Sequence, residues 1–152
     1  MSANHAATPE VSALAQAAAQ PLAPAAELAK RFPLSASDHR ASDAQRQQAL
    51  DELCFGTVFS DHMAHAHWSY EGGWSQREVV PFAPLTLSPA AAVFHYGQEV
   101  FEGIKAYRHE DGSIWTFRPG YNAARLAASA RRLCLPQLGC EDFVASIASL
   151  VR

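Results

Sequence analysis

The stretch VFEGIKAY, residues 100–107, holds one lysine in a largely apolar run and is a natural place to look for chemistry. A lysine amine can form a Schiff base with a carbonyl compound once its surroundings activate it. That lysine is Lys105, and the only other lysine of the chain is Lys30. The residue types alone leave open whether Lys105 reacts or only borders a site.

The histidine-rich stretch DHMAHAHW, residues 61–68, is a second candidate. In a β-strand Asp61, His65 and His67 would lie on one face, because side chains alternate between the two faces, and such a trio can bind zinc. The sequence supplies no recognisable second shell for a metal. We therefore favour a surface or interface role for these residues and for His62, and we predict no metal site.

Three cysteines, Cys54, Cys134 and Cys140, occur without a CxxC spacing. An odd number without that spacing argues against a disulfide framework or a structural zinc, and it fits a reducing compartment. We interpret the cysteines as small buried hydrophobic residues rather than nucleophiles, because no neighbouring feature lowers a thiol pKa. The chain is predicted to be cytoplasmic.

Arg125 lies in the stretch NAARLAASA, where small neighbours leave room for a ligand or another chain. Its guanidinium would suit phosphate, because it offers a planar fork of charge-assisted hydrogen bonds. The competing interpretation is a solvated arginine like Arg131 and Arg132. The spacing alone favours that second interpretation.

Two aromatic residues, Tyr96 and Phe101, flank the sequence GQEV at an expected helix-to-strand transition. Their rings would wall a small apolar pocket or belong to the core, and the core is the commoner place for such rings. In a strand beginning at Val100, Phe101 and Lys105 would share one face, because the side-chain period of a strand is two.

The remaining sequence indicates the elements that position these residues. Residues 1–41 are rich in Ala and Pro, have little to bury and predict a disordered leader. Residues 42–152 predict the folded part, which opens with a helix at SDAQRQQALDEL. We expect order to begin near Ser42.

The folded part alternates hairpins and helices. A hairpin or meander follows Phe55, with a turn at Gly72 and Gly73. Ser88 is placed to cap a short helix that stops at Gly97. A second hairpin turns at HEDG, and two helices follow, near RPGYN and over EDFVASIASLVR. The pattern predicts an α/β fold of the two-layer α+β kind, with a mostly antiparallel sheet and packed helices.

Length and charge limit the function. The chain has 152 residues, of which 49% are hydrophobic, and this suits one domain with a core. Its net charge of -3, without a run of Lys or Arg, argues against nucleic acid or an anionic membrane as a partner. The last helix reaches Arg152 without a stop signal, so we expect the folded unit to continue beyond it.

Three blocks, FGTVFSDHM, HYGQEVFEGIKAYR and FRPGYNAARLAASARRLCLP, carry a family resemblance. In their order and separation they resemble the N-terminal half of a branched-chain amino acid aminotransferase, of the fold type IV class of pyridoxal phosphate enzymes. The resemblance runs from about Asp51 to the C-terminus. The block YGQEVFEG is shared more loosely with D-amino acid transaminases and aminodeoxychorismate lyases.

The resemblance implies roles for individual residues. Arg125 matches the family arginine that holds the phosphate of pyridoxal 5'-phosphate, and Tyr96 and Phe101 match aromatic residues that line the pocket for the substrate's aliphatic side chain. Lys105 matches a position where relatives carry Lys or Arg. Arginine cannot form a Schiff base at ordinary pH, so we interpret Lys105 as a charged residue near the pocket rim and not as the catalytic amine. The family's Schiff-base lysine is expected beyond Arg152, so no catalytic residue is predicted within the chain.

The resemblance also implies a reaction and an assembly. The intact enzyme would transfer the amino group of Leu, Ile or Val to 2-oxoglutarate as a cytoplasmic homodimer. Residues 42–152 would be its N-terminal small domain, truncated before the C-terminal catalytic domain, and inactive alone. Two alternatives remain: a D-amino acid transaminase or aminodeoxychorismate lyase of the same fold, and a non-catalytic truncated or split-gene module that binds a partner or ligand.

Overall fold

The computed structural model describes residues 16, 18–52, 54 and 56–151. Two antiparallel two-stranded sheets and several helices confirm the predicted α+β class with antiparallel pairing. The helices and strands, in chain order, are α2 (Ala25–Leu28), the 3-10 helix η1 (Ala29–Arg31), α3 (Asp43–Glu52), β1 (His62–Ser69), β2 (Gly73–Pro81), α4 (Ala92–Tyr96), β3 (Ala106–Arg108), β4 (Ile114–Thr116), α5 (Pro119–Arg132) and α6 (Cys140–Leu150).

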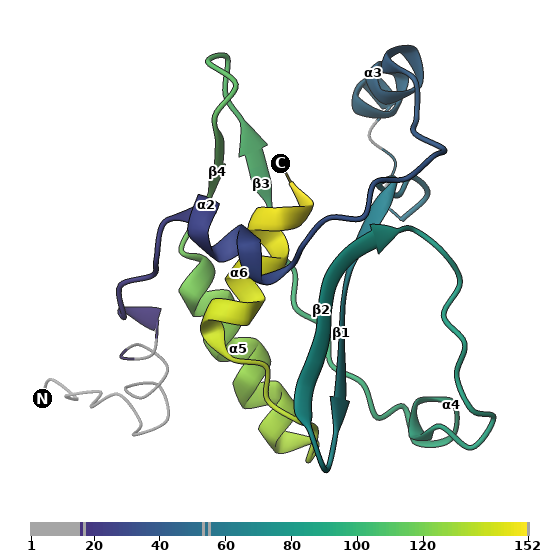
Figure 1. Ribbon diagram of the computed structural model, residues 1–152, viewed down its shortest axis with the longest axis vertical. Coiled ribbons are helices and arrows are strands. Elements are labelled where there is room, and N and C mark those ends of the chain that lie inside the picture. The colour runs from purple at the N-terminus through teal and green to yellow at the C-terminus, as the bar shows by residue number, and fades with distance from the viewer. Residues whose placement is uncertain (1–15, 17, 53, 55, 152) are drawn as a thin grey trace, which may run out of the picture.

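Helix α6 lies at the centre of the packed part. It contacts α2, η1, α5 and both strands of the β1–β2 ribbon, so helices cover one face of that ribbon (Figure 1). The core joins Leu28, Phe32, Val79 and Ala145, which come from three separate parts of the chain. Each of these side chains is at most 3% exposed, and burying a large one contributes about 1.5–3 kcal/mol. The ribbon and the helices are therefore held together by a small apolar core.

The structure places part of the expected leader in this core, upstream of Ser42 where we expected order to begin. Phe32 is 1% exposed. The Val79 N–H donates to Pro33 O at 2.9 Å, and the Ser35 N–H donates to Val79 O at 2.8 Å. The segment after η1 thus pairs with β2, because its apolar residues complete the core. Expectations for residues 1–15 and 17 lie outside the described residues.

A buried carboxylate of α6 ties η1 and β2 together. Asp142, in the first turn of α6, has a side chain only 8% exposed. The Arg31 Nε–H donates to its Oδ1 at 2.7 Å, and the Arg77 Nε–H donates to its Oδ2 at 2.9 Å. Three elements therefore meet at one charge, and the helix N-terminus favours a negative charge there.

The start of α4 differs from the sequence prediction. Gly97 has φ 56, so it ends the helix in the left-handed conformation as expected. The helix begins at Ala92 rather than at Pro89, because Ser88 closes a turn first. The Ser88 Oγ accepts the Ala90 N–H at 3.2 Å, and the Ser88 carbonyl accepts the Ala91 N–H at 2.9 Å. Local side-chain hydrogen bonding of this kind competes with a helical start.

The second hairpin also begins later than expected. Its two strands pair from Ala106 opposite Thr116 to Arg108 opposite Ile114, which confirms the turn at HEDG. Residues 100–105 are not in a strand. The prediction that Phe101 and Lys105 share one face of a strand is therefore wrong. The cause is a short ladder that leaves the preceding residues without a strand partner.

Candidate functional site

A hollow of about 290 Å³ lies where α5 meets the segment leading into β3. The N-terminal half of α5 supplies one wall, and residues 103–105 supply the other. Its lining is Gly103, Ile104, Lys105, Tyr107, Phe117, Arg118, Tyr121, Asn122 and Arg125. Two of the predicted site residues, Lys105 and Arg125, thus come together in one place.

Helix α5 aligns the polar groups of this hollow. Asn122 and Arg125 are three residues apart and so lie on neighbouring turns of one face. Arg118 precedes the helix in the left-handed conformation, with φ 49. The Tyr121 ring contacts two cations, with the Arg118 guanidinium 5.0 Å and the Arg125 guanidinium 5.8 Å from its centroid. Both guanidinium groups therefore have a cation–π contact with this ring.

Glu102 binds Arg125 directly. The Arg125 Nε–H donates to Glu102 Oε2 at 3.0 Å, and Nη2 donates to Oε1. The Asn122 side-chain amide donates to Glu102 Oε1 and to Gly103 O, each at 2.9 Å. The hydrogen bond from Arg125 is the main cause that lowers the pKa of Glu102, against an opposing effect of burial. The same pair raises the pKa of Arg125.

The charges of the site favour an anion. Three cations, Lys105, Arg118 and Arg125, line the hollow, and one carboxylate, Glu102, is bound to Arg125. This leaves an excess of two positive charges among these side chains. A phosphate ester carries about -1.5 to -2 charges at neutral pH, so it would match that excess.

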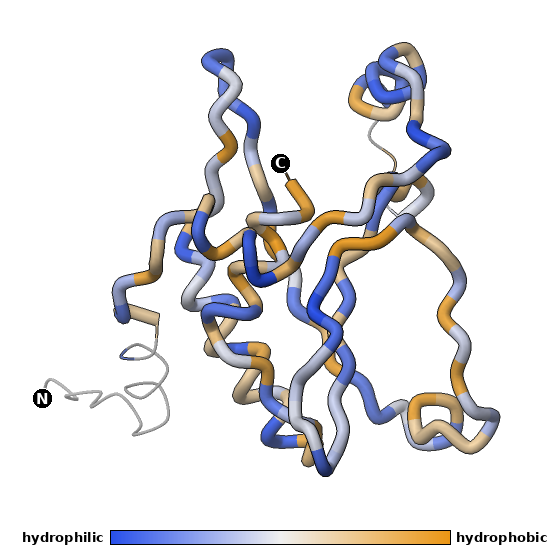
Figure 2. The backbone as a smooth tube through the Cα atoms, in the orientation of Figure 1, coloured by the Kyte–Doolittle hydropathy of each residue, from blue (hydrophilic) through white to orange (hydrophobic). Residues whose placement is uncertain are grey.

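The two predicted aromatic residues lie elsewhere. Tyr96 is 86% exposed and Phe101 is 87% exposed, and neither lines the hollow. Other large apolar side chains of the loop that carries α4 are also exposed, and this loop shows several hydrophobic stretches in Figure 2. They include Phe82, Leu85, Leu87 and Phe94. The described residues therefore leave an apolar surface uncovered near Tyr96.

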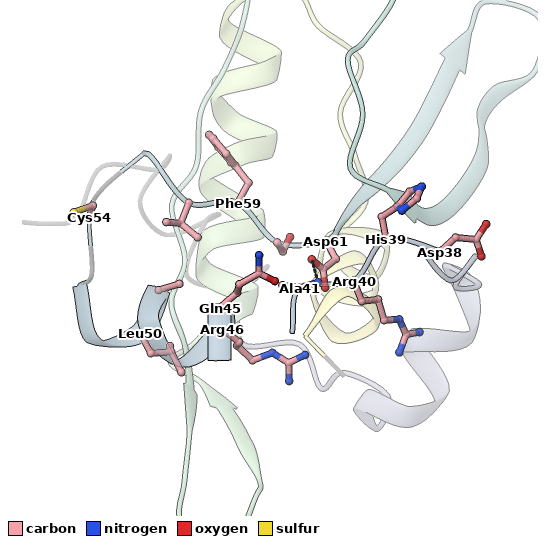
Figure 3. A pocket seen from close by; sticks show the side chains of 13 residues that line it. Asp38, His39, Arg40, Ala41, Gln45, Arg46, Leu50, Cys54, Phe59 and Asp61 are labelled. Atoms are coloured by element: carbon pink, nitrogen blue, oxygen red, sulfur yellow. Dashed lines mark hydrogen bonds between the residues drawn. The ribbon is translucent and has the colours of Figure 1, made fainter. Parts of the chain in front are cut away.

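A larger hollow, of about 1120 Å³, opens between α3 and the chain on either side of it (Figure 3). Leu50, Val58 and Phe59 give it apolar walls, and Arg46 and Asp61 add charges of both signs. The Asp61 Oδ1 accepts the Ala41 N–H at 3.1 Å. Cys54 and Asp61, which the sequence analysis considered for other roles, also line it, but no pocket was predicted here.

The histidines do not form a metal centre within the described residues. A bulge shifts the register between His65, opposite Glu78, and His67, opposite Ser75. His62 accepts the Ser37 N–H at 2.9 Å, and His65 Nδ1 lies 3.7 Å from Glu78 Oε1. The predicted surface or interface role of these histidines stays a prediction.

The three cysteines differ in their exposure. Cys54 and Cys134 are exposed, contrary to the expectation that they are buried, whereas Cys140 is half-buried. Burial raises the pKa of the Cys140 thiol, with a smaller contribution from Glu141.

Within the described part of the chain, no helix combines the length and apolar content that crossing a membrane requires.

Comparison with known proteins agrees with the family resemblance of the three sequence blocks. The chain is 48% identical over 120 residues to the branched-chain-amino-acid aminotransferase of Mycolicibacterium smegmatis. It is 48% identical over 118 residues to the probable branched-chain-amino-acid aminotransferase of Streptomyces coelicolor, and 42% identical over 123 residues to the cytosolic enzyme of that name from Saccharomyces cerevisiae. The aligned parts cover 78–79% of this chain and 33% of each relative.

The aligned part of the chain is homologous to branched-chain-amino-acid aminotransferases. The chain spans about a third of the length of these aminotransferases. No protein-family profile matches it. The Schiff-base lysine expected beyond Arg152 stays a prediction.

Three polar residues at or beside the hollow were not predicted from the sequence. Arg118 and Asn122 line the hollow with Arg125, and Glu102 binds Arg125 and Asn122. The spacing of Asn122 and Arg125, three residues, would have placed them on one helix face, whereas Arg118 precedes the helix. No local pattern predicts Glu102, because its partner lies 23 residues further along the chain.

Proposed function

We propose that this chain is the N-terminal part of a branched-chain-amino-acid aminotransferase. Residues 42–152, together with the packed segment before them, would form its small domain, and a following catalytic domain would supply the Schiff-base lysine. The observation that carries this proposal is the cationic hollow around Arg125. It lies at the residue that the family resemblance assigns to the cofactor phosphate.

The residues of the hollow fit the phosphate of pyridoxal 5'-phosphate. A guanidinium has five N–H donors, and Glu102 uses two of those of Arg125, which leaves three for an anion. Arg118 and Lys105 line the same hollow and add two cations. We propose that Arg125 is the main phosphate ligand. When bound, pyridoxal 5'-phosphate supplies the electron sink that amino-group transfer requires.

The same proposal assigns the substrate side. Tyr96 and Phe101 would bind the aliphatic side chain of Leu, Ile or Val, because their exposed rings offer apolar area. One methylene changes such binding by only about 1–3 kcal/mol, so this pocket defines a class of substrate and not one member. Lys105, exposed at the edge of the hollow, would add a positive charge that attracts anionic 2-oxoglutarate.

We also propose a cytoplasmic homodimer. The exposed side chains of Phe82, Leu85 and Phe94 form apolar surface that a protein partner would cover, and a second copy in the intact enzyme fits that need. The cysteines are free, and free cysteines are typical of a reducing compartment.

Binding of pyridoxal 5'-phosphate and of pyridoxal to the chain tests the proposal. The two molecules differ only in the phosphate, so the ratio of their affinities isolates its contribution. We expect the wild-type chain to prefer the phosphorylated molecule at least about tenfold, and Arg125→Gln to remove most of this preference. Arg132 is exposed on the same helix, and Arg132→Gln removes the same charge. This variant should keep the preference for pyridoxal 5'-phosphate. A wild-type chain without the preference would contradict the proposal.

A further inference from the structure

We propose that Glu102 is a positioning residue for the anion site: it holds one edge of the Arg125 guanidinium so that the other edge stays available to a phosphate group. This inference rests on the proposed function of Arg125. It adds a residue that does not itself contact the anion but determines how the arginine presents its donors.

The contacts carry this inference. Glu102 uses the Nε–H and Nη2 of Arg125, which form one side of the planar guanidinium. The opposite side, formed by Nη1 and the second hydrogen of Nη2, keeps its geometry as a fork, and such a fork matches two phosphate oxygens. A guanidinium without a partner on the first side would rotate about several bonds, and ordering it would reduce the free energy gained on binding.

Burial shows which partner fixes the other. The Glu102 side chain is 9% exposed and the Arg125 side chain is 48% exposed. Asn122 donates to Glu102 and to the Gly103 carbonyl, so it ties the carboxylate to the backbone beside it. The carboxylate is therefore the fixed end of the pair, and the half-exposed arginine is held by it.

The charge of Glu102 raises a rival interpretation, in which the carboxylate competes with the anion for Arg125. Competition would make the anion bind more tightly once Glu102 is neutralised. Positioning would make it bind less tightly. Water around the half-exposed Arg125 screens repulsion between Glu102 and an anion on the far edge, whereas loss of two charge-assisted hydrogen bonds releases the guanidinium. Positioning is therefore expected to dominate.

The two interpretations also differ for a shorter carboxylate. Glu102→Asp keeps the charge but withdraws it by one methylene. A competing charge would act in nearly the same way after this change. A positioning residue would lose its contact with Arg125.

The test is a titration with inorganic phosphate, followed through the Arg125 Nε–H signal in the NMR spectrum of the full chain. In the wild type we expect a resolved signal, protected from exchange with water, which shifts on addition of phosphate. In Glu102→Gln and in Glu102→Asp we expect the Arg125 Nε–H to lose its protection from exchange and the dissociation constant for phosphate to rise about tenfold. Glu110→Gln, in the exposed β3–β4 turn, changes the net charge as Glu102→Gln does and should behave like the wild type.

Several results would overturn the inference. One is a protected Nε–H signal in both Glu102 variants, and another is phosphate affinity that is unchanged or higher in Glu102→Gln. A wild-type chain that shows no phosphate preference in the comparison of pyridoxal 5'-phosphate with pyridoxal would overturn the proposed function and this inference together. A wild type that has the preference, with a Glu102→Gln variant that keeps it, would overturn the inference alone.

Discussion

Replacing Asp142 by Asn is the perturbation whose effect the structure predicts most sharply. The substitution keeps the shape of the side chain but removes the negative charge that Arg31 and Arg77 share. The amide nitrogen would then face one of the two guanidinium groups, donor against donor. The segment after α2, the ribbon and α6 would lose their common anchor.

The magnitude follows from the burial of each partner. Removing one member of a fully buried ion pair costs about 3–5 kcal/mol. Here the carboxylate is 8% exposed, but Arg31 is 42% and Arg77 is 30% exposed, so both cations regain part of their hydration. We therefore expect Asp142→Asn to lower the free energy of unfolding by about 2–3 kcal/mol, and the melting temperature by roughly 10 °C.

Urea denaturation of Asp142→Asn and of a matched control measures this loss. Glu141→Gln is the control, because Glu141 is the neighbouring residue, also pairs with Arg31, and is 56% exposed. An exposed pair contributes at most about 1 kcal/mol, so the control should remain close to the wild type. Equal losses in the two variants, or no loss in Asp142→Asn, would refute the argument that burial gives Asp142 its importance.

Three further predictions concern pH, thiol reactivity and catalysis. Arg125 lowers the pKa of Glu102 below its usual 4.5, so the stability that this pair adds should be constant at neutral pH and be lost as the pH falls below about 4.5. The difference in unfolding free energy between wild type and Glu102→Gln, measured as a function of pH, tests this loss. Burial raises the pKa of Cys140, so iodoacetamide at pH 8 should modify exposed Cys134 first, as peptide mass spectrometry will show; equal rates would count against it. Joined to the remaining part of the Mycolicibacterium smegmatis relative, the chain should transfer amino groups from Leu, Ile and Val to 2-oxoglutarate, and the chain alone should not; activity of the chain alone would contradict this.

The local elements could be predicted from the sequence because local rules determine them. The helix at SDAQRQQALDEL begins where Ser42 and Gln45 exchange hydrogen bonds, a capping box that is readable from four residues. Both hairpins turn at the expected glycine-containing stretches, and Gly97 ends α4 in the left-handed conformation. Each of these features depends on residues close together in the chain.

The features that could not be predicted depend on contacts between distant residues. Phe32 becomes a core residue only because Val79 and α6 provide its neighbours, and its own surroundings in the sequence are rich in Ala and Pro. Glu102 becomes part of a site only because α5 brings Arg125 to it. The exposure of Tyr96 and Phe101 likewise depends on where the loop around α4 lies, which no local pattern determines.

Borohydride trapping tests the central claim most directly, namely that this chain supplies a phosphate contact but not the catalytic amine. The purified chain is incubated with pyridoxal 5'-phosphate, reduced, and digested, and the pyridoxyl label is located by peptide mass. We expect sparse label, spread over Lys30, Lys105 and the amino terminus, with little change in Lys105→Ala. Stoichiometric label confined to Lys105, and abolished by Lys105→Ala, would contradict the account and make Lys105 the reactive amine.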